Sequence, residues 1–258
     1  MATLLNRVDD NPERRMTIVE HLAELRTRIL WSLGALAVAT VFAALFASSI
    51  LEVLRRPLGD LVAAQTTNGQ PAVVLITTEP TEAFGVYIKV ALLSGLILSF
   101  PMHIYQTVMF VAPGLLPHEK RLLYTFLPFA TASFLAGVLF GYFVLLPPAI
   151  QFLLTFGVDY QIAQPYIKVS SYIDLVVRLL LWIGVAFETP MFMLILGRLG
   201  IVRYSQISRF RKYAIVAAWV VAALITPTFD PVNQTLVALP LMALFEVGAQ
   251  LVRIFGKR

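Results

Sequence analysis

The segment SFPMHIYQTVMFVAPGLLPHEKR, residues 99–121, lies between two long apolar stretches, and the rest of the chain is arranged around it. Within this segment, Pro113-Gly114 is a strong turn signal, and Leu116-Pro117 favours a new helix that begins with proline. Glu119 then falls in the first turn of that helix, where the positive end of the helix dipole favours an anion. A short connector between two hydrophobic segments therefore holds one carboxylate at a fixed height above a surface.

The composition is typical of an integral membrane protein. Of the 258 residues, 59% are hydrophobic and only 14% are charged, and the mean hydropathy is +0.80. In a soluble domain, about a quarter of the residues are charged. The apolar residues form blocks of roughly 20 residues, the length that a helix needs to cross a bilayer. We therefore predict an all-α membrane protein in which residues 1–258 form a single integral membrane domain.

The residues that most often carry chemistry are sparse. The chain has no cysteine, which excludes disulfides and thiolate metal sites. The three histidines, His21, His103 and His118, do not have the spacing of metal ligands on one helix. No GxxxxGK[ST] phosphate-binding loop occurs, so ATP hydrolysis is not expected. We expect no enzyme activity, no metal and no cofactor.

Six membrane spans are predicted from the uncharged runs. Thr17-x-x-Glu20 is typical of a helix start, and an amphipathic stretch at the membrane surface follows before the first span. Pro147-Pro148 predicts a break after the third span, and the last two spans are short for a full bilayer. The predicted spans are about 29–51, 84–104, 122–145, 172–196, 213–227 and 234–252.

The distribution of basic residues predicts the orientation. The net charge of +5 alone is compatible with nucleic-acid binding, but here the basic residues flank the apolar runs, so we expect a lipid bilayer and no nucleic acid. Residues 1–16 lack the apolar core of a signal peptide, and we expect them to be a mobile cytoplasmic segment. The positive-inside rule places both termini in the cytoplasm, together with Glu24 and Glu119. Of the 20 Lys and Arg residues, 15 lie on this side: Arg7, Arg14, Arg15, Arg26, Arg28, Lys120, Arg121, Arg198, Arg203, Arg209, Arg211, Lys212, Arg253, Lys257 and Arg258.

Four segments together resemble the TatC family, the multispanning component of the twin-arginine protein translocase. They cover the chain from end to end in the order of the family. The segments are HLAELRTRI (21–29), FPMHIYQTVMFVAPGLLPHEKR (100–121), AFETP (186–190) and ITPTFDPVNQTLVALPLMALFE (225–246).

The resemblance implies a fold, a function and a set of residues. It implies a concave, glove-like bundle of six helices with both termini in the cytoplasm. It also implies that Glu24 and Glu119 recognise twin-arginine signal peptides, because these residues match the family positions for that site. The other positions that match the family pattern are Leu25, Arg26, Phe110, Pro57, the intramembrane acid Glu188 and the acid before the last span, Asp230; the TPTFDP spacing around Asp230 is one residue longer than that pattern. We add Pro113 as a functional candidate from its turn.

Carboxylate is the geometric partner of guanidinium, so two carboxylates on two elements are able to share a pair of arginines. Each acid also has an ordinary interpretation. Glu24 is spaced to form an i,i+4 ion pair with Arg28, and Glu119 is placed to stabilise a helix dipole. From the residues alone the ordinary interpretations are favoured, whereas the resemblance favours the binding site.

Three further acids lie in or near apolar segments. Glu188 lies 14 residues after Asp174, or about 21 Å along a helix, and an ionisable group at that depth usually faces a cavity or a partner. We expect Glu188 to contact a polar group on a partner's transmembrane helix; the alternatives are an internal pair and a protonated, hydrogen-bonded acid. Asp174 and Arg178 are spaced as a structural i,i+4 pair. Glu246 either pairs with a basic residue or binds a partner.

The resulting prediction is the receptor and core subunit of a twin-arginine translocase in a bacterial-type inner membrane, driven by the proton-motive force. The expected partners are the signal peptides of folded cargo and small single-span subunits of the TatA/TatB type, within a multimeric complex. The alternatives are a proton-coupled small-solute transporter with Glu188 as its proton site, and a purely structural membrane subunit.

Overall fold

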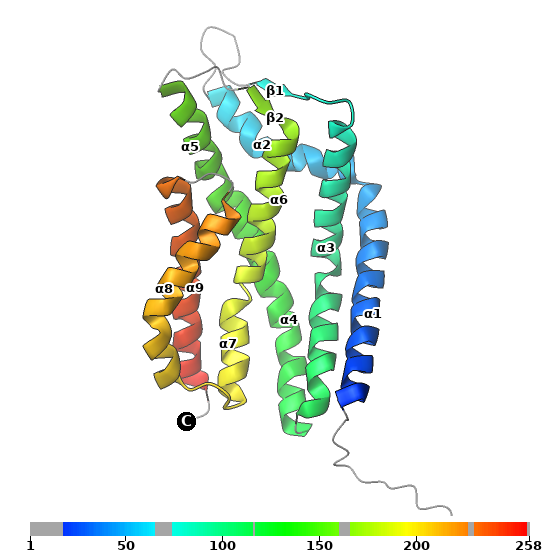
Figure 1. Cartoon of the computed structure of the whole chain (residues 1–258), viewed down its shortest axis with the longest axis vertical. Helices are drawn as coiled ribbons and strands as arrows, with labels where there is room; N and C mark the ends of the chain where they lie inside the picture. Colours follow the sequence, from blue (N-terminus) through cyan, green and yellow to red (C-terminus); the bar gives the residue numbers. More distant parts are fainter. Residues whose placement is uncertain (1–17, 65–73, 116, 160–165, 227–229, 257–258) are drawn as a thin grey trace, which may run out of the picture.

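The computed structural model describes residues 18–64, 74–115, 117–159, 166–226 and 230–256, and these residues are mostly helical (Figure 1). Five stretches within them are long and apolar enough to cross a membrane: Val19–Ala44, Glu82–Val111, Glu119–Leu154, Val169–Arg198 and Pro231–Phe255. The predicted helical, multispanning architecture is confirmed. The predicted segment 1–16 and the helix start at Thr17 lie outside the described residues.

In chain order the elements are α1 (Ile18–Ala44), α2 (Ala47–Ala64), β1 (Val74–Ile76), α3 (Glu82–Val111), a 3-10 turn (Ala112–Gly114), α4 (Pro117–Phe140), a π turn (Gly141–Leu145), α5 (Leu146–Asp159), β2 (Tyr166–Lys168), α6 (Val169–Ala186), α7 (Thr189–Arg198), α8 (Tyr204–Ile225) and α9 (Pro231–Phe255).

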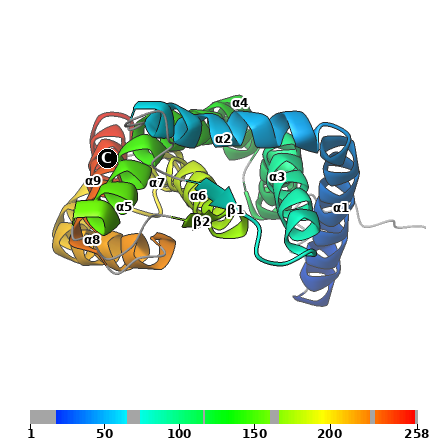
Figure 2. The ribbon, with the colours of Figure 1, turned by 90° about the horizontal axis from the view of Figure 1, so that it is seen from above.

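The described connectors predicted to be cytoplasmic gather at one end of the molecule, which we call the basic end. Figure 1 shows at this end the start of α1, the α3–α4 connection, the α7–α8 connection and the end of α9. Seen from above, α1 and the α8–α9 pair lie at opposite ends of the molecule (Figure 2). Helix α1 packs mainly against α3, α4 packs against both α3 and α6, and α9 packs against α7 and α8.

The first helix is shorter than predicted, and a second helix replaces part of the predicted connector. Helix α1 ends at Ala44, and α2 begins at Ala47 within the predicted span 29–51. Figure 2 shows α2 running across the end of the molecule opposite the basic end. Its buried side chains, Ala47, Leu54 and Leu58, recur at helical spacing on one side, so an amphipathic period was present in the sequence.

The predicted break at Pro147-Pro148 is wrong. Helix α4 continues through the π turn directly into α5, so the segment 146–171, predicted as a connector, begins with a helix of 14 residues. In the π turn the Leu146 amide donates to the Gly141 carbonyl, which changes the hydrogen-bond register just before the prolines. Both prolines directly follow this turn, so their missing N–H groups fall where the register of the hydrogen bonds has already changed.

The fourth predicted span, 172–196, consists of two helices. Helix α6 ends at Ala186, and α7 begins at Thr189 with Pro190 in its first turn. Proline is favoured at such a position because its missing N–H belongs to a group that has no helical partner anyway. Glu188 therefore lies at the turn between the helices and not inside a continuous helix.

The last two helices are longer than the predicted 213–227 and 234–252. Helix α9 has 25 residues, and α8 has 22 residues, of which the first nine include Arg209, Arg211 and Lys212. The apolar part of α8 is therefore short. Its crossing of the membrane, and with it the count of six spans, stays a prediction.

A continuous apolar core joins the helices. Its fully buried side chains include Leu146, Ile173, Val176 and Ile183, and Phe134 of α4 stacks on Phe100 of α3 at a ring distance of 3.4 Å. At the end opposite the basic end, β1 and β2 form a two-stranded parallel sheet, which the sequence analysis did not predict. This core fixes α3, which carries Phe110, and α4, which carries Glu119, and α1 with Glu24 packs against α3.

Candidate functional site

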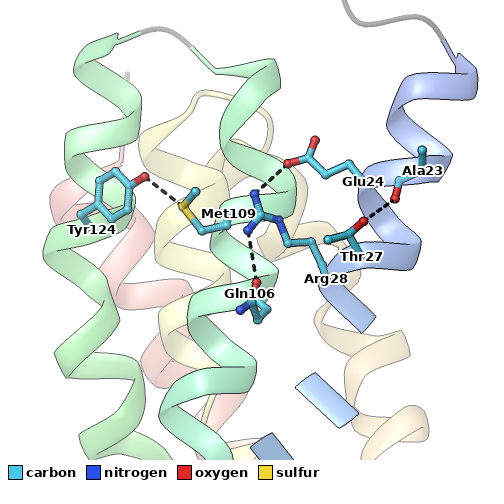
Figure 3. Close-up of polar contacts among 7 residues, drawn as sticks. All are labelled: Ala23, Glu24, Thr27, Arg28, Gln106, Met109 and Tyr124. Carbon is cyan, nitrogen blue, oxygen red and sulfur yellow. Dashed lines mark hydrogen bonds and ion pairs between the residues drawn. The ribbon is translucent and has the colours of Figure 1, made fainter. Parts of the chain in front are cut away.

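Glu24 lies in the second turn of α1 at the basic end and pairs with Arg28 one turn later. The distance from Arg28 Nη2 to Glu24 Oε1 is 3.0 Å, so the ordinary interpretation of Glu24, an i,i+4 ion pair, is present in the structure. Figure 3 shows that the same guanidinium also reaches α3, where Arg28 Nη1 donates to Gln106 Oε1 at 3.3 Å. Gln106 is 4% exposed, and its amide nitrogen lies 3.8 Å from Met102 Sδ. The Glu24 side chain is thereby held at the junction of α1 and α3.

This cluster leaves two polar atoms without partners. Glu24 Oε2 and Arg28 Nε are both buried and make no hydrogen bond in the part of the chain that the structure describes. A buried acceptor without a donor is costly, so its persistence needs an explanation. Arg28 therefore satisfies only one of the two carboxylate oxygens of Glu24.

Aromatic and apolar side chains lie next to this carboxylate. The rings of His21 on α1 and Phe110 on α3 are stacked, with centroids 4.3 Å apart and an angle of 16° between planes. Leu25 is half-buried, and Arg26 is exposed. The structure thus brings Phe110 and Glu24 together on two adjacent helices, whereas Arg26 points away from the packed side of α1.

Glu119 lies in the first turn of α4, as predicted, and is half-buried. Pro113 belongs to the 3-10 turn that precedes α4 and is exposed. Tyr124 on α4 lies 3.1 Å from Met109 Sδ on α3 (Figure 3), which ties the start of α4 to the end of α3. Glu24 and Glu119 therefore lie at the same end of the molecule on α1 and α4, with α3 packed against both helices.

Glu188 borders a small apolar pocket between α3, α4 and α7. The pocket has a volume of about 140 Å³, and Thr107 of α3, Leu127 of α4 and Phe192 of α7 contribute to its lining. Glu188 Oε1 is buried and has no hydrogen-bond partner among the described residues. No ion pair of Glu188 is present among the described residues, so its predicted contact with a partner stays a prediction.

Two other candidate acids have partners within the chain. Glu246 on α9 pairs with Arg211 on α8 at 2.6 Å, which is the first of its two predicted alternatives. Asp230 is the N-cap of α9, where its Oδ1 accepts from the Asn233 backbone at 2.6 Å. Pro57 lies inside α2, opposite the basic end, and is half-buried. These three residues are distant in the fold from the Glu24 cluster.

The predicted pair of Asp174 and Arg178 is wrong. Asp174 on α6 pairs instead with Lys89 on α3, with an Nζ–Oδ1 distance of 2.6 Å. The partner lies 85 residues away in the sequence, and only the packing of α3 against α6 brings the two together.

Two important polar residues were missed. Gln106 was missed because a single amide in an apolar helix forms no repeating pattern in the sequence. Its spacing of four residues from Met102 and from Phe110 places the three side chains on one side of the helix, and this spacing was the one indication in the sequence. Glu82 was missed because it lies within the segment 52–83, which was predicted to be a connector. Its carboxylate accepts from the Thr78 backbone at 2.8 Å and from the Ser170 backbone at 2.9 Å, so it caps α6 from the first turn of α3.

Among the described residues, no group of three or more acidic or histidine side chains is arranged to hold a metal ion.

Comparisons with known proteins agree with this arrangement. The family description "Sec-independent protein translocase protein (TatC)" matches residues 20–240. The TatC protein of Aquifex aeolicus (strain VF5) is 38% identical over 236 residues, which cover 90% of this chain and 93% of that protein. The TatC protein of Synechocystis sp. (strain ATCC 27184 / PCC 6803 / Kazusa) is 34% identical over 98% of this chain and 93% of its own length. A crystal structure of the "Twin Arginine Translocase Receptor- TatC" superimposes with a TM-score of 0.79 at 37% identity, covering 91% of this chain and 99% of that one. The chain is a multi-pass membrane protein of the TatC family, the twin-arginine translocase subunits.

Proposed function

We propose that this chain is the receptor and core subunit of the twin-arginine translocase, and that it binds twin-arginine signal peptides at its basic end. The similar solved structure is described as a twin-arginine translocase receptor, which supports the assignment. The observation that carries the proposal is the buried, unpartnered Glu24 Oε2 at the α1–α3 junction. It offers one acceptor to a guanidinium group in a site from which water is partly excluded.

In this proposal the two acids divide the two arginines of the signal peptide. One guanidinium binds Glu24 Oε2 while Arg28 keeps Oε1, and the other binds Glu119 in the first turn of α4. Carboxylates suit arginine because its planar fork presents parallel N–H donors, which the ammonium group of lysine lacks. Phe110, stacked on His21, supplies an apolar surface beside Glu24, and Leu25, Arg26 and the Pro113 turn complete the rim.

The same proposal assigns the orientation in the membrane. The basic end faces the cytoplasm with both termini, in a bacterial-type inner membrane, because lysine and arginine are enriched on cytoplasmic connectors. The helices form a concave, glove-like bundle of six spans with α8 as the short one, and Pro57 and Asp230 lie toward the other compartment.

Glu188 is proposed to contact a polar group on the transmembrane helix of a small single-span partner of the TatA/TatB type. Its orphan Oε1 and the apolar pocket beside it support a site where a partner helix donates a hydrogen bond. In this view the chain performs no covalent chemistry. It scaffolds a multimeric complex that exports folded proteins, and the proton-motive force supplies the energy.

Binding of a synthetic signal peptide to the purified protein in detergent tests the receptor function. The peptide carries either Arg-Arg or Lys-Lys, and the variants are Glu24→Ala, Glu119→Ala and the control Glu79→Ala. Glu79 is an exposed acid at the opposite end whose nearest cation, Lys168, is 3.7 Å away. We expect each site variant to lose most of the affinity and the control to retain it. Equal binding of both peptides, or indifference to both site variants, would refute the proposed site.

The proposed contact of Glu188 has a separate test. Glu188→Ala is compared with wild type for crosslinking to the single-span partners and for export of a folded cargo. Unchanged crosslinking together with unchanged export would exclude the contact. Membership of the TatC family does not favour the alternative of a proton-coupled solute transporter.

A further inference from the structure

Two tyrosine hydroxyls reach the backbone of α2 next to a proline. Tyr142 of the π turn donates a hydrogen bond to the Val53 carbonyl at 2.6 Å. Tyr172 of α6 donates to the Leu54 carbonyl, also at 2.6 Å. The two accepting residues are consecutive in α2, and Pro57 follows them within the next turn. Donors from two distant parts of the chain therefore converge on one turn of this helix.

Pro57 explains why one of these carbonyls is available. In an α-helix the carbonyl of residue i accepts from the N–H of residue i+4. Pro57 stands four positions after Val53 and has no N–H, and a proline ring also pushes against the carbonyl four residues earlier. The Val53 carbonyl thus lacks its helical donor, and the Tyr142 hydroxyl supplies the missing hydrogen bond.

Tyr172 is held at the neighbouring carbonyl for a different reason. Its side chain is 4% exposed and belongs to the same apolar core as Leu54 and Leu58 of α2. A tyrosine hydroxyl that is buried needs an acceptor, and the Leu54 carbonyl is the acceptor in the structure. This hydrogen bond therefore joins α2 to the first turn of α6.

The two hydrogen bonds connect α2 to elements outside its main packing partners. Helix α2 packs mainly against α3 and α5, whereas the tyrosines come from the π turn and from α6. Figure 2 shows α2 crossing the end of the molecule opposite the basic end. Apolar packing is not directional, whereas a hydrogen bond fixes both a distance and an angle. The tyrosines therefore specify where the middle of α2 lies.

We infer that Pro57, Tyr142 and Tyr172 form a latch that fixes the position of α2 across this end of the molecule. Pro57 is a positioning residue in this latch, because it frees a backbone acceptor and contacts no ligand itself. The resemblance to the TatC family implies a functional role for Pro57 but no mechanism, and the latch supplies one. The latch is independent of the proposed signal-peptide site, which lies at the opposite end of the molecule.

A double-mutant cycle tests the role of Pro57 in the latch. Tyr142→Phe keeps the ring and removes the hydroxyl, so it should lower the melting temperature by about 2–4 °C, the effect of one hydrogen bond. In the Pro57→Ala background the same substitution should lower it by roughly half of that or less, because the new N–H donates to the Val53 carbonyl. Equal losses in the two backgrounds would overturn the role of Pro57.

Tyr87→Phe is the matched control for this cycle. Tyr87 also donates its hydroxyl to a backbone carbonyl, that of Ala44. Ala44 is the last residue of α1, so its carbonyl lacks a helical donor whether or not Pro57 is present. Tyr87→Phe should therefore lower the melting temperature equally in both backgrounds. A smaller loss in the Pro57→Ala background for this variant too would mean a general effect of the proline and would contradict the latch.

A distance measurement tests the position of α2 directly. The chain has no cysteine, so spin labels are attached at Arg56→Cys on α2 and Leu98→Cys on α3, both of which are exposed positions. The added change Tyr142→Phe/Tyr172→Phe should shift or broaden the distance distribution measured by electron paramagnetic resonance. Tyr124→Phe, whose hydroxyl contacts Met109 at the basic end, should leave the distribution unchanged. An unchanged distribution in the double tyrosine variant would show that apolar packing alone positions α2, and the latch would be refuted.

Discussion

Arg28 on α1 donates a hydrogen bond to the buried side chain of Gln106 on α3, with 3.3 Å between Nη1 and Oε1. The contact joins residues 78 positions apart and fixes the guanidinium between the two helices. Since the other nitrogen of the fork already holds Glu24 Oε1, Gln106 prevents Arg28 from turning both donors toward Glu24. The amide thus keeps the second carboxylate oxygen of Glu24 free.

The variant Gln106→Leu should therefore weaken binding of a twin-arginine peptide. Without the amide, Arg28 is free to form a bidentate pair with Glu24, which occupies the oxygen proposed for the peptide. A hydrogen bond to a charged group contributes about 1.5–3 kcal/mol, so we expect roughly a tenfold or greater loss of affinity. Peptide binding measured by fluorescence anisotropy in detergent checks this expectation.

Thr107→Val is the matched control for Gln106→Leu. Thr107 follows Gln106 in α3, is exposed, and donates only to the His103 carbonyl of its own helix at 2.9 Å. Its replacement should leave the affinity within about twofold. Unchanged affinity in Gln106→Leu would mean that Arg28 does not compete with the peptide for Glu24.

The ion pair of Lys89 and Asp174 provides a test of the packing of α3 against α6. We expect Lys89→Met and Asp174→Asn each to lower thermal stability, and the double variant to be less destabilised than the sum of the two, with a coupling of about 1 kcal/mol. Arg178→Met should show no coupling to Asp174→Asn. Melting temperatures of the purified proteins in one detergent provide the comparison, and coupling to Arg178 in place of Lys89 would contradict the structure.

Local relationships were predictable from the sequence, and those set by packing were not. The pair of Glu24 and Arg28 and the place of Glu119 in the first turn of α4 follow from spacing within one helix. The partner of Asp174 does not, because both Arg178 and Lys89 are suitable cations and only tertiary packing selects between them. The same limit applies to Gln106, whose role depends on the approach of a second helix.

Proline alone did not predict the helix boundaries. The boundary at Thr189-Pro190 was missed because residues 172–196 were predicted as one span, whereas the break predicted at Pro147-Pro148 lies in a continuous helical stretch, because the π turn absorbs the change in register. Helix α2 was missed because charges and Pro57 obscured its apolar period. Membership of the TatC family, in contrast, was predictable from four segments whose order carries the information.

Gly95 on α3 allows α1 to approach closely. A Cβ added at this position would lie 2.6 Å from the Thr40 Cα on α1, a distance that requires the helices to separate. Small residues at helix interfaces in membranes serve this purpose. We expect Gly95→Ala to destabilise the protein by about 1–3 kcal/mol and to weaken peptide binding, because the Glu24 cluster spans the same two helices.

Gly85→Ala is the control for this substitution on the same helix. No atom lies within 4 Å of a Cβ added there, so the variant should match wild type or be slightly more stable through its higher helix propensity. Melting temperature and peptide affinity are measured for both variants. Equal behaviour of the two alanines would show that the α1–α3 approach is not limiting.

The Glu82 carboxylate joins the start of α3 to the start of α6. It is 7% exposed and accepts backbone hydrogen bonds from Thr78 and Ser170 with its two oxygens. Glu82→Ala leaves both amides without this acceptor, so hydrogen exchange at residues 77–81 and 168–172 should accelerate several-fold and the melting temperature should fall. Glu82→Gln, which keeps one carbonyl oxygen, should have an exchange rate and a melting temperature between those of the alanine variant and wild type. Glu79→Ala should leave exchange at residues 168–172 unchanged.

Since this cluster lies opposite the basic end, binding of a twin-arginine peptide should be retained in all three variants. Loss of peptide binding in Glu82→Ala without a change in exchange would mean that Glu82 acts on the signal-peptide site and not as a cap of α6.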